Sequence, residues 1–266
     1  MSTAPVARQR RHTLYFLDEI RGHKPVFLDT EVDMTRIEEH RTAGRRVSTL
    51  SYVLYAASRV IAAHPEANAA IHGRLLPKIA RYSSVSGKIA LDKRVGGRRV
   101  VLAAVLPRLE ETALHEIQRQ VEHYRDGDPA TMPEFAGVHT LHRLPWPVAR
   151  LAYARTVRPL SRRAGKFGTL AVSSLGHRPV DGFHSVGGTT VTLGLGQVTD
   201  RPVVRRDAVR IAPVMRLNLT FDHRVIDGAE AADILGEIKT ALEGFQEDAP
   251  PAAAAQAVAA GKGGER

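Results

Sequence analysis

The chain of 266 residues contains no cysteine, few aromatic residues and no long apolar run. Without cysteine, disulfides, thiolate zinc sites and a cysteine nucleophile are excluded, and a reducing compartment such as the cytoplasm is expected. No stretch reaches the roughly 18 apolar residues that a membrane-spanning helix requires, so no transmembrane segment is expected. Aromatic residues make up only 5% of the chain, so the stacking platforms of single-strand nucleic-acid binders are scarce.

Positive charge is what the chain has in excess, with a formal net charge of +10. The arginines and lysines occur as pairs and triplets scattered along the whole sequence rather than as one block. Scattered charge is typical of a solvated surface, so no nucleic-acid partner is expected. A few of these arginines would serve equally well for a small polyanionic ligand.

One large domain is expected, from residue 12 to residue 246. Residues 1–11 are polar and basic, which predicts a flexible arm, and residues 247–266 are rich in Ala and Gly, which predicts a disordered tail. Strand-like and amphipathic segments are mixed between these ends without strict alternation. This order predicts an α/β (α+β) fold in which helices cover a mixed sheet.

The local patterns predict six strands and four helices. The predicted strands cover residues 26–33, 84–91, 99–106, 168–173, 189–195 and 215–221. The predicted helices cover residues 34–40, a segment between a cap at Ser48 or Thr49 and Pro65, residues 109–125 and residues 229–245. Gly96 and Gly97 allow the chain to reverse, so residues 84–91 and 99–106 are expected to pair.

The most informative segment is residues 222–228, Asp-His-Arg-Val-Ile-Asp-Gly, directly after the last predicted strand. His223 stands where that strand ends, and a neutral imidazole can take the proton of a thiol or alcohol near neutral pH. A satisfied core histidine is the alternative, and the surrounding motif favours catalysis. Asp227 precedes a helix and is interpreted as a buried structural anion rather than as the acid of a hydrolase triad.

Three other sequence patterns are weaker indications of a functional site. His139 and His142 have a His-x-x-His spacing without a third ligand, so no metal is expected. Gly194-Leu195-Gly196 lacks the third glycine of a dinucleotide fingerprint and is interpreted as a strand end. His177 and His184 either line an acceptor site or lie on a surface loop.

Residues 25–35, 65–73, 168–176 and 217–235 together resemble the catalytic domain of the dihydrolipoamide acyltransferase components of 2-oxoacid dehydrogenase complexes. They are more distantly similar to chloramphenicol acetyltransferase. The resemblance implies a chloramphenicol-acetyltransferase-like fold, a mixed β-sheet packed by helices. It also implies a homotrimer or a higher assembly, with active sites at subunit interfaces.

The resemblance also implies roles for particular residues. His223 matches the general base, and Ser173 matches the hydroxyl that stabilises the oxyanion, with Ser174 as the neighbouring alternative. Asp227 matches a structural partner that pairs with an arginine of the N-terminal arm, Arg11 or Arg10. Coenzyme A is implied as the acyl-CoA substrate, with no metal and no covalent lipoyl group.

Two features depart from that family. No lipoyl or subunit-binding segment precedes residue 12, and residues 126–166 form an atypically long insertion. Within it, residues 144–155 are apolar and basic, which fits a lid, a membrane-surface helix, a subunit contact or an extra packing helix.

We therefore expect transfer of an acyl group, in the first instance acetyl, from acyl-CoA to a hydroxyl, amine or thiol acceptor, in specialised metabolism. One alternative is a detached dihydrolipoyl acyltransferase core subunit of a 2-oxoacid dehydrogenase complex, which acts on a separate carrier protein. The other is a catalytically silent trimeric scaffold.

Overall fold

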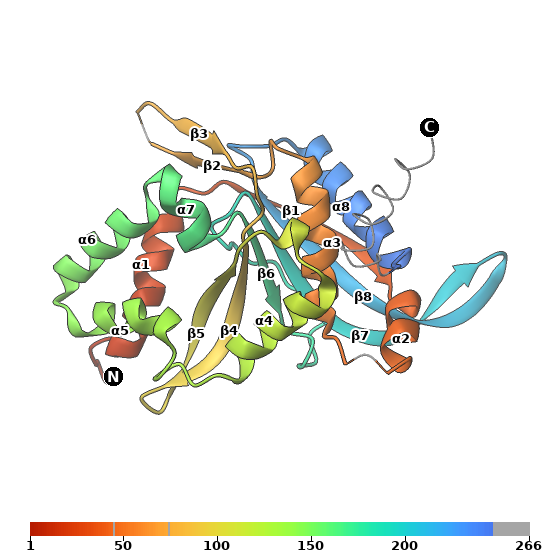
Figure 1. Cartoon of the computed structure of the whole chain (residues 1–266), viewed down its shortest axis with the longest axis horizontal. Helices are drawn as coiled ribbons and strands as arrows, with labels where there is room; N and C mark the ends of the chain where they lie inside the picture. The colour runs from red at the N-terminus through yellow and green to blue at the C-terminus, as the bar shows by residue number, and fades with distance from the viewer. Residues whose placement is uncertain (45, 74, 247–266) are drawn as a thin grey trace, which may run out of the picture.

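A mixed six-stranded sheet forms the centre of the molecule, and helices cover both of its faces (Figure 1). The computed structural model describes residues 1–44, 46–73 and 75–246. The strand order across the sheet is β1 (Pro25–Asp33), β8 (Ala208–Asp222), β7 (Val191–Arg205), β6 (Leu170–Ser174), β4 (Gly87–Val95) and β5 (Arg98–Leu106). β6 is parallel to both of its neighbours, and every other adjacent pair is antiparallel. The expected mixed sheet is confirmed.

One face of the sheet carries the main hydrophobic core. Alternate strand residues such as Ile89, Leu193 and Leu219 are fully buried there, as the two-residue period of a strand requires. The helices α3 (Thr49–Ala63), α4 (Leu114–Asp126) and α8 (Gly228–Glu243) cover this face. The hydroxyl of Ser48 accepts the backbone N–H of Ser51 at 3.3 Å, so Ser48 is the cap of α3.

The opposite face is covered by α1 (Arg11–Ile20), α7 (Leu160–Phe167) and the loop of residues 176–190. With α5 (Ala136–Arg143) and α6 (Trp146–Val157), these helices form a group beside β5, at the left of Figure 1. Aromatic rings join α1 to the group: Phe16 stacks on Phe167 at 5.7 Å, and Tyr15 meets the edge of Trp146 at 5.0 Å. The insertion therefore folds as three helices that pack on α1.

Shorter elements complete the chain. They are η1 (Arg8–Arg10), α2 (Thr35–Thr42), the hairpin of β2 (Ala69–His72) and β3 (Lys78–Arg81), η2 (Leu109–Glu111) and η3 (Pro133–Phe135). Helical structure thus begins at Arg8, inside the arm that the sequence predicts to be flexible. The predicted tail, residues 247–266, lies outside the described residues.

The bounds of three strands, β4, β7 and β8, differ clearly from the predictions. β4 continues through Val95, so residues 92–95 belong to a strand and only Gly96 and Gly97, both with positive φ, form the turn. β7 and β8 each span 15 residues, well beyond the predicted 189–195 and 215–221. Their distal halves project as a hairpin, at the right of Figure 1, and both faces there are largely exposed. Such a segment lacks the alternation that marks a half-buried strand.

Candidate active site

His223 directly follows β8 and faces solvent. Its backbone N–H donates to the carbonyl oxygen of Lys24 at 3.0 Å, which continues the β1–β8 pairing by one residue. The side chain is 47% exposed, and its ring lies 5.5 Å from that of Phe221. His223 is therefore fixed through its backbone, while its imidazole ring is accessible to solvent.

Asp227 contacts His223, and within one chain its side chain is exposed rather than buried. Its Oδ1 lies 3.3 Å from Nδ1 of His223, and its side chain is 89% exposed at the start of α8. Arg11 instead donates to the carbonyl oxygen of Leu144 at 3.4 Å, and Arg10 lines a separate groove. Within one chain, Asp227 pairs with neither arginine. Its carboxylate lies beside Nδ1, on the side of the ring away from Nε2.

Asp222 is the structural carboxylate of this segment. It is buried, accepts hydrogen bonds from Nε of Arg224 at 2.9 Å and from the N–H of Lys24 at 3.3 Å, and lies 3.6 Å from Nε2 of His23. Burial alone would raise the pKa of the Asp222 carboxyl, but the hydrogen bonds from Arg224 and the neighbouring positive charges hold that pKa below its ordinary value. Sequence reasoning missed this role, although Asp222 is the last strand residue on the face opposite the core.

Ser173 lies at the carboxyl end of β6, on a groove. The neighbouring Oγ of Ser174 accepts the backbone N–H of Gly176 at 3.4 Å. The hydroxyl of Ser173 has no hydrogen-bond partner among the described residues. Of the two serines, Ser173 has the hydroxyl that is available to a ligand.

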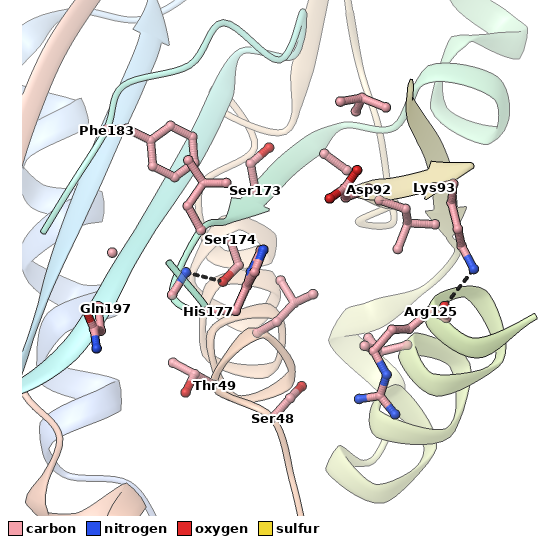
Figure 2. A pocket seen from close by; sticks show the side chains of 18 of the residues that line it. Ser48, Thr49, Asp92, Lys93, Arg125, Ser173, Ser174, His177, Phe183 and Gln197 are labelled. Atoms are coloured by element: carbon pink, nitrogen blue, oxygen red, sulfur yellow. Dashed lines mark hydrogen bonds between the residues drawn. The ribbon is translucent and has the colours of Figure 1, made fainter. Parts of the chain in front are cut away.

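The groove has a volume of about 1070 Å³ and opens where β6 ends while β4 and β7 continue on either side. Figure 2 shows Ser173 and Ser174 on one side and Lys93 and Arg125 on the other. The lining contains the cations Arg10, Arg41, Lys93, Arg99 and Arg125, the carboxylate Asp92, and His177. Arg41, Arg99 and Arg125 are paired with Glu38, Asp92 and Asp126, so the positive charge of the groove is partly compensated.

His177 and His184 have different surroundings in the structure. His177 lines the groove. His184 packs its ring against Phe27 of β1 at 5.1 Å and does not line the groove.

Ser173 and His223 do not meet within one chain. Ser173 pairs with Gly194 of β7, Gly194 pairs with Asn218 of β8, and His223 lies five residues beyond Asn218. At about 3.3 Å per strand residue, the two side chains are offset by roughly 16 Å along the sheet, with two strand spacings between them. A site that uses both residues must combine two copies of the chain.

The weaker sequence motifs have structural explanations. His142 shares a hydrogen bond of 3.0 Å with His12, His139 bonds the carbonyl oxygen of Pro129 at 2.7 Å, and burial lowers the pKa of His142 to about 4. Within the part of the chain that the structure describes, no group of three metal-binding side chains occurs. Gly194 and Gly196 lie inside β7 rather than at its end, beneath the loop of residues 176–190.

The fold is that of dihydrolipoamide acetyltransferases. A probable dihydrolipoamide acetyltransferase from Listeria monocytogenes superposes with a TM-score of 0.68 and 18% identity, over 94% of this chain and 98% of that one. The dihydrolipoamide acetyltransferase of Azotobacter vinelandii superposes with a TM-score of 0.67 and 19% identity, over 91% of each chain.

The sequence comparison leads to the same group of proteins. Residues 148–248 match the model of the 2-oxoacid dehydrogenases acyltransferase catalytic domain. The acetyltransferase component of the Bacillus subtilis pyruvate dehydrogenase complex is 25% identical over 229 residues, 82% of this chain and 44% of that protein. The chain is thus related to the acyltransferase catalytic domains of 2-oxoacid dehydrogenases, which confirms the resemblance.

The similarity to individual relatives is limited in extent. The succinyltransferase component of the Bos taurus 2-oxoglutarate dehydrogenase complex is 49% identical over 51 residues, 19% of this chain and 11% of that protein. The chain spans less than half the length of these curated relatives.

Proposed function

We propose that this chain transfers an acyl group from an acyl-CoA thioester to a hydroxyl, amine or thiol acceptor. The hydroxyl of Ser173, which has no partner among the described residues, carries the proposal, because it faces a cation-lined groove in an acyltransferase fold. The groove would hold the phosphate-bearing donor, and His223 would act on the acceptor. No helix among the described residues is long and apolar enough to cross a membrane.

The reaction needs a proton acceptor and an oxyanion donor. Nε2 of His223 takes the acceptor's proton as the acceptor attacks the thioester carbonyl, which typically contributes about 10²–10⁴ in rate. The carbonyl oxygen becomes an oxyanion, and the hydroxyl of Ser173 donates a hydrogen bond to it, worth about 3–4 kcal/mol. The C–S bond then breaks, and the coenzyme A thiolate takes the proton from His223.

The complete site would lie between two copies of the chain, as a homotrimer would provide. The surface that follows His223 is acidic, with Asp227, Asp233 and Glu237 all exposed. Five of the six charged residues that line the groove with Ser173 are cations. Opposite charge on two surfaces of the same chain supports their contact in an assembly.

A dihydrolipoyl thiol on a separate carrier protein is the second candidate acceptor. The matched relatives are named as dihydrolipoyllysine-residue acetyltransferases and succinyltransferases, and this observation favours it. The chain would then act as a core subunit of a dehydrogenase complex.

The test is a free-thiol assay with acetyl-CoA and a panel of dihydrolipoamide, alcohols and amines. We expect thiol release with at least one acceptor, a loss of about 10²–10⁴ in His223→Ala and of about 10²–10³ in Ser173→Ala. Ser174→Ala is the matched control and should retain most activity. Unchanged turnover in His223→Ala would exclude the mechanism, and no turnover with any acceptor would favour a silent scaffold.

A further inference from the structure

The three insertion helices carry positive charge without any acidic residue. Residues 136–167 contain six arginines and one lysine, and no Asp or Glu. Arg150 and Arg158 pair with Asp18 and Glu19 of α1, at 3.2 and 2.9 Å. The remaining exposed cations, which have no ion-pair partner among residues 1–44, 46–73 and 75–246, are Arg143, Arg155, Arg162 and Lys166. This end of the molecule is therefore a surface of uncompensated positive charge.

An apolar ridge of two exposed side chains lies on α6, on the same side of the helix as Arg155. Val148 and Leu151 of α6 are 51% and 52% exposed. Together with Arg155 they are spaced three and four residues apart, so they share one side of the helix. Val157 is buried on the opposite side. Figure 1 shows α6 at the outer edge of the molecule.

The only tryptophan of the chain stands at the start of the ridge. Trp146 is 37% exposed, and its buried side packs against Tyr15. A tryptophan with one face packed and one face open is typical of a boundary between apolar and aqueous surroundings.

We propose that α6, with the flanking cations of α5 and α7, binds the surface of an anionic lipid bilayer. Val148 and Leu151 would enter the boundary between headgroups and acyl chains, while Arg155, Arg162 and Lys166 contact lipid phosphates. An acidic protein would also satisfy the cations, but a projecting helix with an apolar ridge fits a flat interface. The proposal does not depend on acyl transfer, because neither His223 nor Ser173 belongs to this surface.

Trp146 reports on the contact directly. We expect the full chain to co-sediment with phosphatidylglycerol vesicles at low salt, with a blue shift of the Trp146 emission. Binding to phosphatidylcholine vesicles should be at least about tenfold weaker, and added salt should weaken binding to the anionic vesicles.

Two variants test the two parts of the surface. Arg155→Glu with Arg162→Glu and Lys166→Glu should weaken binding to the anionic vesicles by more than about tenfold. Val148→Ser with Leu151→Ser, which keeps every charge, should also weaken it several-fold and reduce the blue shift. Circular dichroism confirms that each variant retains the fold.

A charge-matched control separates this surface from the overall net charge. Arg94, Arg98 and Arg206 are exposed elsewhere on the molecule, and their triple change to Glu should alter vesicle binding less than threefold. His223→Ala should bind vesicles as the unaltered chain does, even where it abolishes acyl transfer.

Several results would overturn the proposal. They are absence of binding to phosphatidylglycerol vesicles, equal loss of binding in the charge-matched control, and sedimentation without a change in the Trp146 emission. A Trp146 shift with poly-glutamate but not with vesicles would identify an acidic protein as the partner.

Discussion

At the scale of single residues, Asp222 is the buried carboxylate that holds the segment around His223. It accepts from Arg224 and from the backbone of Lys24, and the next backbone N–H, that of His223, donates to Lys24. The Asp222 carboxylate and the backbone N–H of His223 both bond the backbone of Lys24. Loss of the carboxylate should therefore displace the His223 imidazole as well as weaken the fold.

Asp222→Asn should lower the free energy of unfolding at pH 7 by roughly 3–5 kcal/mol, because it leaves Arg224 without its partner. The pKa of Asp222 is lowered in the folded protein, so its contribution is present above the ordinary carboxyl pKa and is lost as pH falls through the lowered value. The difference between the two proteins should therefore vanish in strong acid. Urea unfolding at pH 7 and below pH 3 measures it.

Asp227→Asn is the matched control for that experiment. The Asp227 side chain is 89% exposed, so the substitution should change the free energy of unfolding of the protein by no more than about 0.5 kcal/mol. Equal destabilisation by the two changes would contradict the assignment of the structural role to Asp222.

Lys88 is a second residue with an unusual setting. Its ammonium group donates to the carbonyl oxygen of Gly187 and lies 3.9 Å from the ring of Phe167. Burial, with a smaller contribution from the nearby Arg163, lowers the pKa of Lys88 to about 7. No carboxylate forms an ion pair with Lys88 within the described part of the chain.

Lys88→Met should raise the melting temperature near pH 6. In the unfolded chain the Lys88 amine stays protonated up to about pH 10.4. In the folded protein, burial of the charged ammonium group lowers the free energy of unfolding. The gain from the substitution should therefore be full below pH 7 and disappear as pH rises to 10. Thermal unfolding at both pH values tests this, and a lower melting temperature at pH 6 would mean that the contacts of Lys88 with Gly187 and Phe167 outweigh its burial.

Among the elements, the loop of residues 176–190 depends on glycines in β7. A Cβ atom at Gly196 would lie 1.8 Å from the carbonyl oxygen of Asp181, and one at Gly194 would lie 2.2 Å from that of Phe183. The loop carries His177 and Phe183 along the groove. Close packing of this loop on β7 therefore shapes the wall beside Ser173.

Gly196→Ala should displace the loop, lower stability by about 1–3 kcal/mol and weaken coenzyme A binding. Isothermal titration with coenzyme A and thermal unfolding measure the two effects. Gly236→Ala in α8, where a Cβ has open space, should instead stabilise the protein by roughly 0.5–1 kcal/mol. Unchanged coenzyme A affinity in Gly196→Ala would separate the loop from the proposed donor site.

The elements that could be predicted from the sequence are those in which burial of one face produces a regular spacing of apolar residues. α4 and α8 each bury one clear face, so their periodicity was informative. Helix α6 overlaps residues 144–155, for which an extra packing helix was one interpretation. Helices α5 and α7 were missed because each is only eight residues long. The far half of the β7–β8 hairpin was missed because both of its faces are largely exposed. The role of Asp222 was missed for another reason: its partners, Lys24 and His23, come from a distant segment that only the fold brings near.

For the whole molecule, the separation of Ser173 from His223 predicts complementation between inactive variants. In a mixed trimer of equal parts His223→Ala and Ser173→Ala, each interface requires one unaltered histidine and one unaltered serine. Random assembly gives about one intact interface in four, so about a quarter of the original activity should return. Co-refolding of the two variants followed by the free-thiol assay measures it, and complete inactivity of the mixture would contradict a site shared between two copies.

The roughly 16 Å offset along the sheet also has a kinetic consequence. If neither copy holds a whole site, an isolated chain is inactive however well it is folded. Specific activity should then fall on dilution, with a midpoint at the dissociation constant of the assembly, while the circular dichroism spectrum stays constant. The enzyme's turnover would thus depend on its own concentration.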